Sequence, residues 1–260
     1  MLQPWSTEEV HELVDNRIQS IIDRSGGSEY EVFLTGPGNF RFDIATIAPY
    51  KGQRQGDKPP HWATVGERLK SHWGAKEVSG IEADDALAIR ATSDGGNYII
   101  ASRDKDLRQV PCSHYSWKCG DNQPEIPTYT FENLGEVYYR QNSSGGYDLK
   151  GCGPLFFYAQ LLTGDNIDNI KGCKGVGAKT AVAILNGLTS EEEALKQCIY
   201  QYQKKYANWK EVLEENARLL YLIRDPEWYE VEDKGGNCFN YKVNKFWEIP
   251  SNILESINDS

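Results

Sequence analysis

The chain has 260 residues, 39% of them hydrophobic, and a formal net charge of −10. This length suits one large domain or two smaller domains with a genuine hydrophobic core. The sequence has no apolar run of about 18 residues, which argues against a membrane-spanning helix. Its first residues lack the basic and apolar regions of a secretory signal. We therefore expect a cytoplasmic protein whose six cysteines are reduced thiols.

Helices and strands are predicted to alternate over the first half of the chain. Residues 6–24 form an amphipathic pattern that begins with a capping box from Ser6 to Glu9. Further helices are expected over 62–73 and 81–92. Strands are expected over 30–35, 76–78, 97–101, 110–117 and 126–130. This alternation predicts an α/β core with a mostly parallel sheet.

After about residue 130 the pattern becomes helical. Helices are predicted over 154–163, 178–187, 190–206 and 208–223. The run Ser143–Gly146 is the most flexible-looking segment near this change. We expect an α/β core over residues 1–130 and a helical region over 131–260.

Seven acidic side chains occur in three short motifs: Glu82, Asp84 and Asp85, then Asp104 and Asp106, then Asp165 and Asp168. The first motif opens a predicted helix and the second follows a predicted strand, where ligands bind in parallel sheets. Each motif alone has a structural explanation as a helix start, an Asp cap or an Asx-rich loop. Together, seven converging acids would repel each other unless cations lay among them. The sequence therefore predicts a site for Mg²⁺ or Mn²⁺, with two ions.

A glycine- and lysine-rich loop follows the third acidic motif. Gly172 and Gly177 have the spacing of a phosphate-binding P-loop, but Ala178 stands where that motif needs lysine. A turn between two helices fits better, because its exposed amides bind phosphates without reading base sequence. The residues predicted to contact DNA are Gly172, Lys174, Gly175, Gly177, Lys179 and Thr180.

A second basic segment lies between Tyr50 and Lys76, with six basic residues against two acidic ones. Such a local patch can bind a polyanion on an acidic protein, because the field of each charge is short-ranged at cellular salt. Solvated surface lysines are the plainer interpretation of this segment.

In this order, over about residues 30–190, these motifs resemble the 5′-3′ exonuclease and flap endonuclease superfamily, and most of all its phage members. The resemblance implies a PIN-like (resolvase-like) sheet flanked by helices, followed by a helix–three-turn–helix DNA-binding region at about 160–187. It also implies an arch or gateway at about 40–75.

The resemblance assigns roles to residues of this sequence. All seven acids match metal ligands, with Asp165 and Asp168 at the second metal position. Tyr50, Lys51 and Arg54 match the start of the gateway, where an aromatic ring stacks on a base. Lys51 and Arg54 are the expected catalytic cations at the scissile phosphate. The glycine loop matches a duplex-binding loop, which implies a K⁺ ion at 172–177.

The activity implied by the resemblance is metal-dependent, structure-specific 5′ nuclease chemistry in DNA replication. The expected substrates are DNA with 5′ ends or flaps, with RNA–DNA hybrids cut by an RNase H activity. We expect a monomer without membrane contact, located in the bacterial host cell if the gene belongs to a phage.

Two departures from the family pattern keep an alternative open. Family members open with an Asp-bearing strand that this sequence lacks, and Asp15 in the first predicted helix is a poor substitute. Gly36 stands where a second family Asp often ends a strand. The alternatives are a shortened chain, a partner that supplies the segment, or a DNA-binding relative with weakened or lost catalysis. Binding that persists in EDTA, without cleavage in Mg²⁺ or Mn²⁺, would favour the last.

Overall fold

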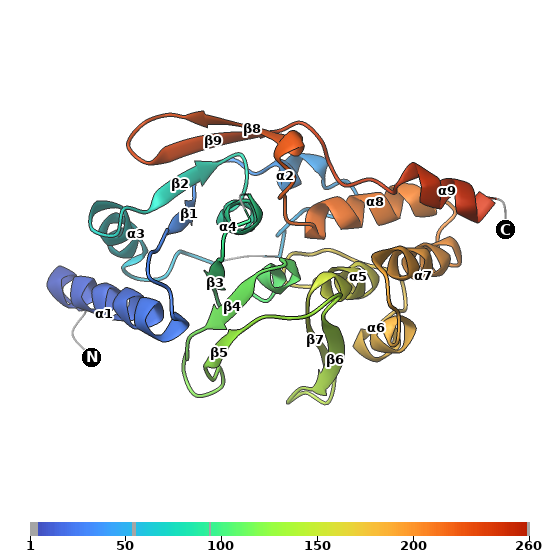
Figure 1. Ribbon diagram of the computed structural model, residues 1–260, viewed down its shortest axis with the longest axis horizontal. Helices are drawn as coiled ribbons and strands as arrows, with labels where there is room; N and C mark the ends of the chain where they lie inside the picture. The colour runs from blue at the N-terminus through green and yellow to red at the C-terminus, as the bar shows by residue number, and fades with distance from the viewer. Residues whose placement is uncertain (1–4, 54–55, 94, 259–260) are drawn as a thin grey trace.

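The computed structural model describes residues 5–53, 56–93 and 95–258. Its first half alternates helices and strands, coloured blue to green in Figure 1. The elements of this half are α1 (Thr7–Ser25), β1 (Phe33–Thr35), α2 (Phe40–Ile44), α3 (Trp62–Ser71), β2 (Lys76–Ser79), α4 (Ala83–Thr92), β3 (Ile99–Ala101), β4 (Ser113–Ser116) and β5 (Ile126–Tyr129). The predicted helices and strands of this half are confirmed, with ends that shift by a few residues.

The second half begins with a hairpin and continues with helices. Its elements are β6 (Glu136–Gln141), β7 (Tyr147–Cys152), α5 (Pro154–Thr163), α6 (Ala178–Leu185), α7 (Glu191–Gln203), α8 (Trp209–Leu220), β8 (Tyr229–Asp233), β9 (Cys238–Val243) and α9 (Ser251–Asn258). The four helices predicted between 154 and 223 are all present.

Two sheets form the α/β part. The first has the order β1-β2-β9-β8, in which β1, β2 and β9 run parallel and β8 runs antiparallel. The second has the order β3-β4-β5, with β3 and β4 parallel. Helix α4 packs against β1, β2 and β3 and so connects the two sheets (Figure 1). The predicted α/β class with parallel strands is confirmed.

The predicted helical region over 131–260 also contains two pairs of strands, which the prediction did not include. Strands β6 and β7 pair as an antiparallel hairpin. Strands β8 and β9 return to the first half of the molecule, where β9 pairs with β2. The first sheet is therefore built from both halves of the sequence, and residue 130 does not divide the fold.

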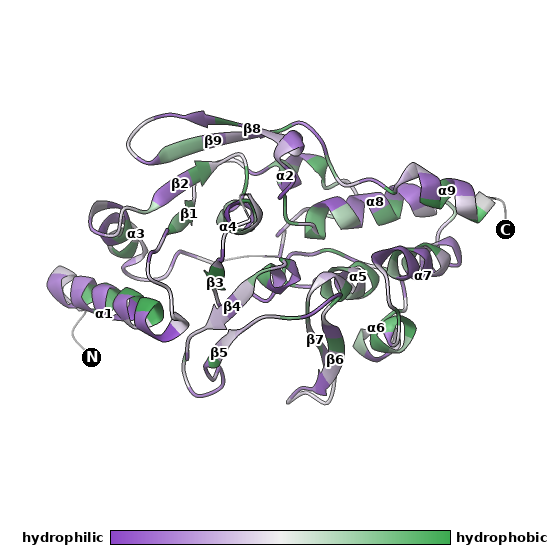
Figure 2. Ribbon diagram, viewed as in Figure 1, coloured by the Kyte–Doolittle hydropathy of each residue, from purple (hydrophilic) through white to green (hydrophobic). Residues whose placement is uncertain are grey.

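The main hydrophobic core surrounds α5, of whose 10 residues only Pro154 and Thr163 escape burial. Figure 2 shows this helix as hydrophobic, whereas α1 is mostly hydrophilic. A helix that is apolar all round belongs inside a protein, and α6, α7 and α8 pack around α5. No helix in the described parts of the chain is both long and apolar enough to cross a membrane.

Candidate active site

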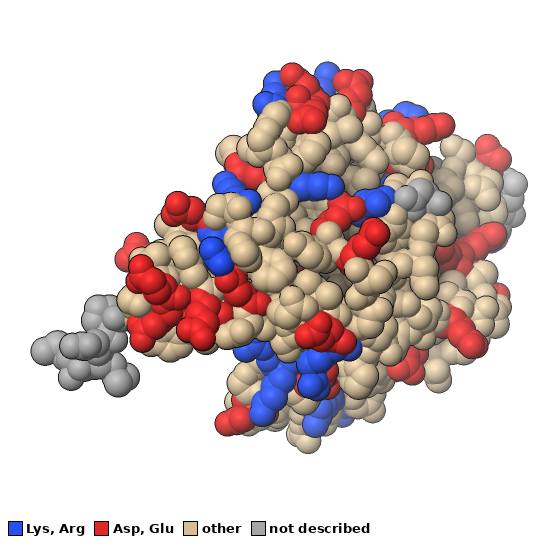
Figure 3. Space-filling model, turned by 60° about the vertical axis from the view of Figure 1, so that its left-hand side comes forward, with Lys and Arg blue, Asp and Glu red and all other residues tan. Residues whose placement is uncertain are grey.

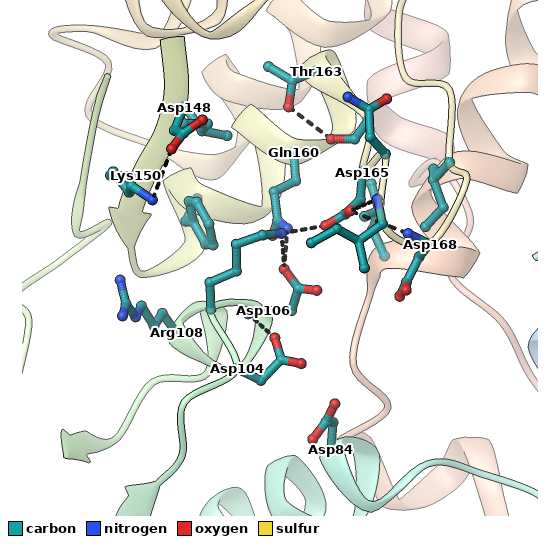
Figure 4. Close-up of a pocket in the computed structure, with 18 of the residues that line it drawn as sticks. Asp84, Asp104, Asp106, Arg108, Asp148, Lys150, Gln160, Thr163, Asp165 and Asp168 are labelled. Carbon is teal, nitrogen blue, oxygen red and sulfur yellow. Dashed lines mark hydrogen bonds and ion pairs between the residues drawn. The ribbon is translucent and has the colours of Figure 1, made fainter. Parts of the chain in front are cut away.

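The acidic motifs meet in a cleft of about 1180 Å³ between the sheets and the helical half. Thr35 at the end of β1, the residues after β3 and the start of α4 border it on one side. The loop after α5 borders it on the other side. This placement follows from the sheet, because the carboxyl ends of parallel strands open onto the same edge. Figure 4 shows Asp84, Asp104 and Asp106 on one side and Asp165 and Asp168 on the other.

Asp85 does not face the cleft. It is fully buried in an ion pair with Arg41, which is only 1% exposed. The guanidinium donates from Nη1 to Oδ2 at 2.6 Å and from Nη2 to Oδ1 at 2.8 Å. Arg41 also donates to the carbonyl oxygens of Leu219 and Tyr221, at 2.9 Å each. Because Asp85 is fully buried in this pair and does not line the cleft, its prediction as a metal ligand is wrong in this structure.

Asp85 instead positions Glu82, the residue that precedes α4. The Glu82 amide donates to Asp85 Oδ2 at 3.1 Å. The Glu82 carboxylate lies in the cleft, where Lys51 Nζ forms an ion pair with Oε1. The two acids, three residues apart, therefore have different roles that their spacing alone does not distinguish.

Tyr50 connects two acidic motifs. Its hydroxyl contacts Glu82 Oε2 at 3.0 Å and Asp168 Oδ2 at 3.1 Å. Burial and these two carboxylates raise the pKa of Tyr50, so the hydroxyl remains a donor. The ring is only 5% exposed, and a buried ring cannot stack on a base. Base stacking by Tyr50 is therefore wrong, and Arg54 of the same predicted gateway lies outside the described residues.

The second acidic motif surrounds a lysine. Lys105 Nζ lies 2.9 Å from Asp106 Oδ1 and also pairs with Asp165, which comes from the loop after α5. Gln160 of α5 donates its amide to Asp106. The Asp106 amide donates to Asp104 Oδ1 at 2.9 Å, which turns the chain after β3 so that both acids face the cleft.

The carboxylates in the cleft shift each other's pKa values. Burial, followed by the charge of Asp104, raises the pKa of Asp84 to about 7. Removal from solvent within the cleft and the charge of Asp106 raise the pKa of Asp104. Burial would also raise the pKa of Asp165, but the neighbouring Lys105 outweighs it and lowers that pKa. Lys105 lowers the pKa of Asp165, whereas the net effect at Asp84 and at Asp104 is a raised pKa.

Asp165 lies in a turn that requires glycine at both ends. Gly164 has φ 72° and Gly172 has φ 61°. A Cβ on Gly172 would lie 2.2 Å from the Gly164 nitrogen. Asp165 Oδ1 accepts from the Ile167 amide at 2.7 Å and holds the turn from inside. Gly172 is buried and packs against Gly164, so its predicted contact with DNA is wrong in this structure.

After Gly172 the loop alternates between exposed and buried positions, with Cys173, Val176 and Ala178 buried. Lys174, Gly175, Gly177 and Thr180 are exposed, and no atom lies within 4 Å of a Cβ built on either glycine. Helix α6 begins directly behind Gly177 and has no side-chain cap, which leaves its first amides free for an anion. Lys179 Nζ lies 3.7 Å from the centre of the Tyr147 ring, so this cation contacts the β6–β7 hairpin.

The two positions that depart from the family pattern do not join the cleft. Asp15 accepts from Arg68 Nε at 3.0 Å and from Trp73 Nε1 at 2.8 Å, which ties α1 to the end of α3. At Gly36, a Cβ would lie 2.9 Å from the Val78 carbonyl oxygen, so no side chain fits there without a shift. Neither Asp15 nor Gly36 therefore supplies a carboxylate to the cleft.

The remaining acids have the chemistry that a divalent ion needs. Carboxylate oxygens are the preferred ligands of Mg²⁺. Beside Asp106, Gln160 Oε1 is buried and has no hydrogen-bond partner within the described residues. However, among those residues no three Asp, Glu, His or Cys side chains lie close enough together to hold a metal ion as they stand. The donors fit the ion, but their side chains must move to enclose it.

Sequence reasoning missed three groups that shape this cleft. Arg41 follows an aromatic residue, a local pattern that gives no sign of burial. Lys105 lies between two predicted ligands, and Gln160 lies inside an apolar helix. A polar residue in the middle of an otherwise buried helix is a usable signal, because such a residue needs a partner.

The fold and the cleft define an α/β protein with carboxylates gathered at the ends of parallel strands and a glycine-rich loop beside them. No protein-family model matches the chain. It is 32% identical over 171 residues to DNA polymerase I of Bacillus caldotenax, a match that covers 63% of this chain and 18% of the polymerase. It is 32% identical over 113 residues to a 5′-3′ exonuclease of Mycoplasma pneumoniae, covering 42% of this chain and 35% of the exonuclease.

The matches thus span between 18% and 35% of these relatives' length. Among solved structures, the phage T5 D15 protein co-crystallised with metal ions has a TM-score of 0.50 and 16% identity. That likeness covers 84% of this chain and 83% of the T5 chain, and it shows a shared fold. Together, these findings confirm the resemblance to the 5′-3′ exonuclease and flap endonuclease superfamily.

Proposed function

We propose that this chain is a divalent-metal-dependent 5′ nuclease that hydrolyses phosphodiesters in DNA at 5′ ends or flaps. The observation that carries this proposal is the cleft itself. Carboxylates from α4, from the turn after β3 and from the loop after α5 converge there, and the pKa of Asp84 rises to about 7. Mere binding of a polyanion does not need such an accumulation of negative charge, and indeed opposes it.

The proposed ligands of the ions are Asp84, Asp104, Asp106, Asp165 and Asp168, with Glu82 beside them. When bound, two such ions supply an activated water and stabilise the leaving oxygen of the phosphodiester. Tyr50 orients Glu82 and Asp168 through its hydroxyl. Lys51, which pairs with Glu82 in the cleft, is the proposed cation for the scissile phosphate.

The proposed binding site for the DNA duplex is formed by the exposed residues of the glycine loop between Lys174 and Thr180. The first amides of α6, which have no side-chain cap, suit backbone phosphates. A K⁺ ion at 172–177, RNA–DNA hybrids as further substrates and a monomeric chain complete the proposal. Each of these rests on the resemblance.

Cleavage of a 5′-labelled flap duplex tests the proposal directly. We expect cutting in Mg²⁺ or Mn²⁺, none in EDTA, and a loss of at least about 100-fold in Asp104→Asn, since even outer-shell changes at metal sites cost about 10–100-fold. The matched control is Asp23→Asn, an acid of α1 far from the cleft, which should cut at the normal rate. Equal cutting by both variants would contradict the proposal.

A second candidate function is DNA binding without catalysis. The observation in its favour is that, within the described residues, no three acids are close enough to hold an ion as they stand. Binding and cleavage of the same labelled flap duplex distinguish a nuclease from a DNA-binding protein without catalysis. A flap that is bound equally in EDTA and in Mg²⁺, and that stays uncut in Mg²⁺ and in Mn²⁺, would support the binding protein and overturn the nuclease.

A further inference from the structure

The β6–β7 hairpin packs one face against the protein, and residues of both its faces line the cleft. Val137 and Leu149 pack against the main core, and α6 contacts both strands. On the same side, Lys179 of α6 lies over the rings of Tyr139 and Tyr147. These contacts attach the hairpin to α6 and to the main core, beside the acidic cleft.

The other face of the hairpin carries cations and an aromatic ring. Tyr138 pairs with Lys150 across the strands and Arg140 pairs with Asp148. Side chains of directly paired residues share a face, so these four project together. All four line the cleft, and Tyr138 is 48% exposed. Two acids share this face: Asp148, at 3.7 Å from Lys150 Nζ, and the exposed Glu136, which does not line the cleft.

Arg108 adds a third cation beside Arg140 and Lys150, on the side of the acids. It belongs to the short helix Asp106–Gln109 that follows β3, and it lines the same cleft. Figure 4 shows Arg108 and Lys150 on one side, with Asp104 and Asp106 next to them. On the face drawn in Figure 3, basic side chains gather beside acidic ones although the chain carries a net charge of −10.

We propose that the outer face of the β6–β7 hairpin binds an unpaired nucleic-acid strand and leads it to the carboxylates. This inference deepens the proposed nuclease function and rests on it. An exposed ring between cations is the surface that single strands use, because a base can stack on the ring while the cations contact phosphates. A duplex presents phosphates to such a face but keeps its base faces covered. Tyr138 therefore takes the stacking role that the buried Tyr50 cannot fill.

Fluorescence anisotropy tests this binding without any cutting. The protein is the full chain with Asp104→Asn, in EDTA, and the probe is a labelled oligothymidine of about 15 nucleotides. We expect Tyr138→Ala to weaken affinity at least about fivefold, while Tyr138→Phe keeps most of it because the ring remains. We expect Arg140→Gln with Lys150→Gln to reduce the slope of log affinity against log salt by about 1.4, or about 0.7 for each lost phosphate contact.

The control pair is Lys234→Gln with Lys242→Gln, which removes the same charge from the β8–β9 hairpin away from the cleft. Equal losses in both pairs would mean that net charge alone matters, and would overturn the inference. An unchanged salt slope, or no binding of the single strand by the parent protein, would also overturn it. Flap cleavage by the wild-type chain is measured separately. If the wild type cuts the flap but the hairpin variants bind the single strand normally, only the hairpin inference is wrong. If the hairpin variants lose binding but the wild type does not cut, only the proposed nuclease activity is wrong.

Discussion

At the scale of single residues, burial separates acids that look equivalent in the sequence. Asp84 and Asp85 are neighbours at the start of α4, yet Asp84 faces the cleft and Asp85 is paired with Arg41. Motif matching placed both in one metal site because it records residue type and spacing. It cannot record which side of the helix the rest of the chain covers, since that depends on α8, more than a hundred residues later.

The Arg41–Asp85 pair is expected to be essential to stability as a pair. Arg41→Ala should lower the free energy of unfolding by about 3–5 kcal/mol, because it leaves a buried carboxylate without a counterion. The double change Arg41→Met with Asp85→Leu should cost clearly less than the single change, because no charge remains buried. Urea unfolding at pH 7 measures both. A double variant as unstable as the sum of its single variants would show that the two side chains act independently.

At the scale of elements, α1 is attached to the fold by polar contacts, because Val10 is the only buried residue of this helix. Asp15 makes one attachment, through Arg68 of α3 and Trp73, and Arg24 makes another through its ion pair with Glu125. The hydrogen bond from Arg68 lowers the pKa of Asp15 to about 2 from 3.8. The ionised form is therefore favoured in the folded state, and its contribution to stability is present at neutral pH.

We expect Asp15→Asn to cost on the order of 1 kcal/mol of unfolding free energy at pH 7. Because the folded pKa lies below the unfolded one, this cost should persist down to about pH 4 and disappear as the pH falls toward 2. Unfolding curves of both proteins at stepped pH measure the difference, with Asp23→Asn of the same helix as a control. A difference that grows as the pH falls would contradict this assignment.

The two hairpins that the sequence analysis missed share one cause. The hairpin β6–β7 was passed over because Ser143–Gly146 looked like a flexible linker, although it joins two segments rich in β-formers. Gly235 and Gly236 join β8 and β9 in the same way. A glycine pair between such segments is a hairpin signal, and giving it more weight would have found both. The pairing of β9 with β2 is different, because no local pattern specifies a partner so far away in the chain.

At the scale of the whole molecule, the cleft lies where separately built parts meet. Helix α4 belongs to the sheet half, whereas the loop that carries Asp165 and Asp168 follows the central helix α5 of the other half. The acids of the two halves face each other across this junction (Figure 4). Their repulsion weakens the junction, and a cation bound there would strengthen it. Metal binding and global stability should therefore be coupled.

Mg²⁺ should raise the melting temperature of the wild-type chain in the absence of any substrate. An ion present at about 100 times its dissociation constant adds about 2.7 kcal/mol. For a chain of this size that amounts to a shift of about 5–10 °C. Because the folded pKa of Asp84 is raised to about 7, the wild type in EDTA should lose stability as the pH rises from about 4 toward 7.

The change Asp84→Asn separates the stabilisation by Mg²⁺ from the loss of stability caused by the ionised Asp84 carboxylate. In EDTA at pH 8 the variant should melt at a higher temperature than the wild type, because it removes a carboxylate whose charge the fold disfavours. In Mg²⁺ it should gain less than the wild type, because it lacks a ligand for the ion. Asp23→Asn should behave as the wild type in both conditions. If Mg²⁺ stabilised Asp84→Asn as fully as the wild type, the ion would bind outside this cleft, and the junction between the two halves would not depend on it.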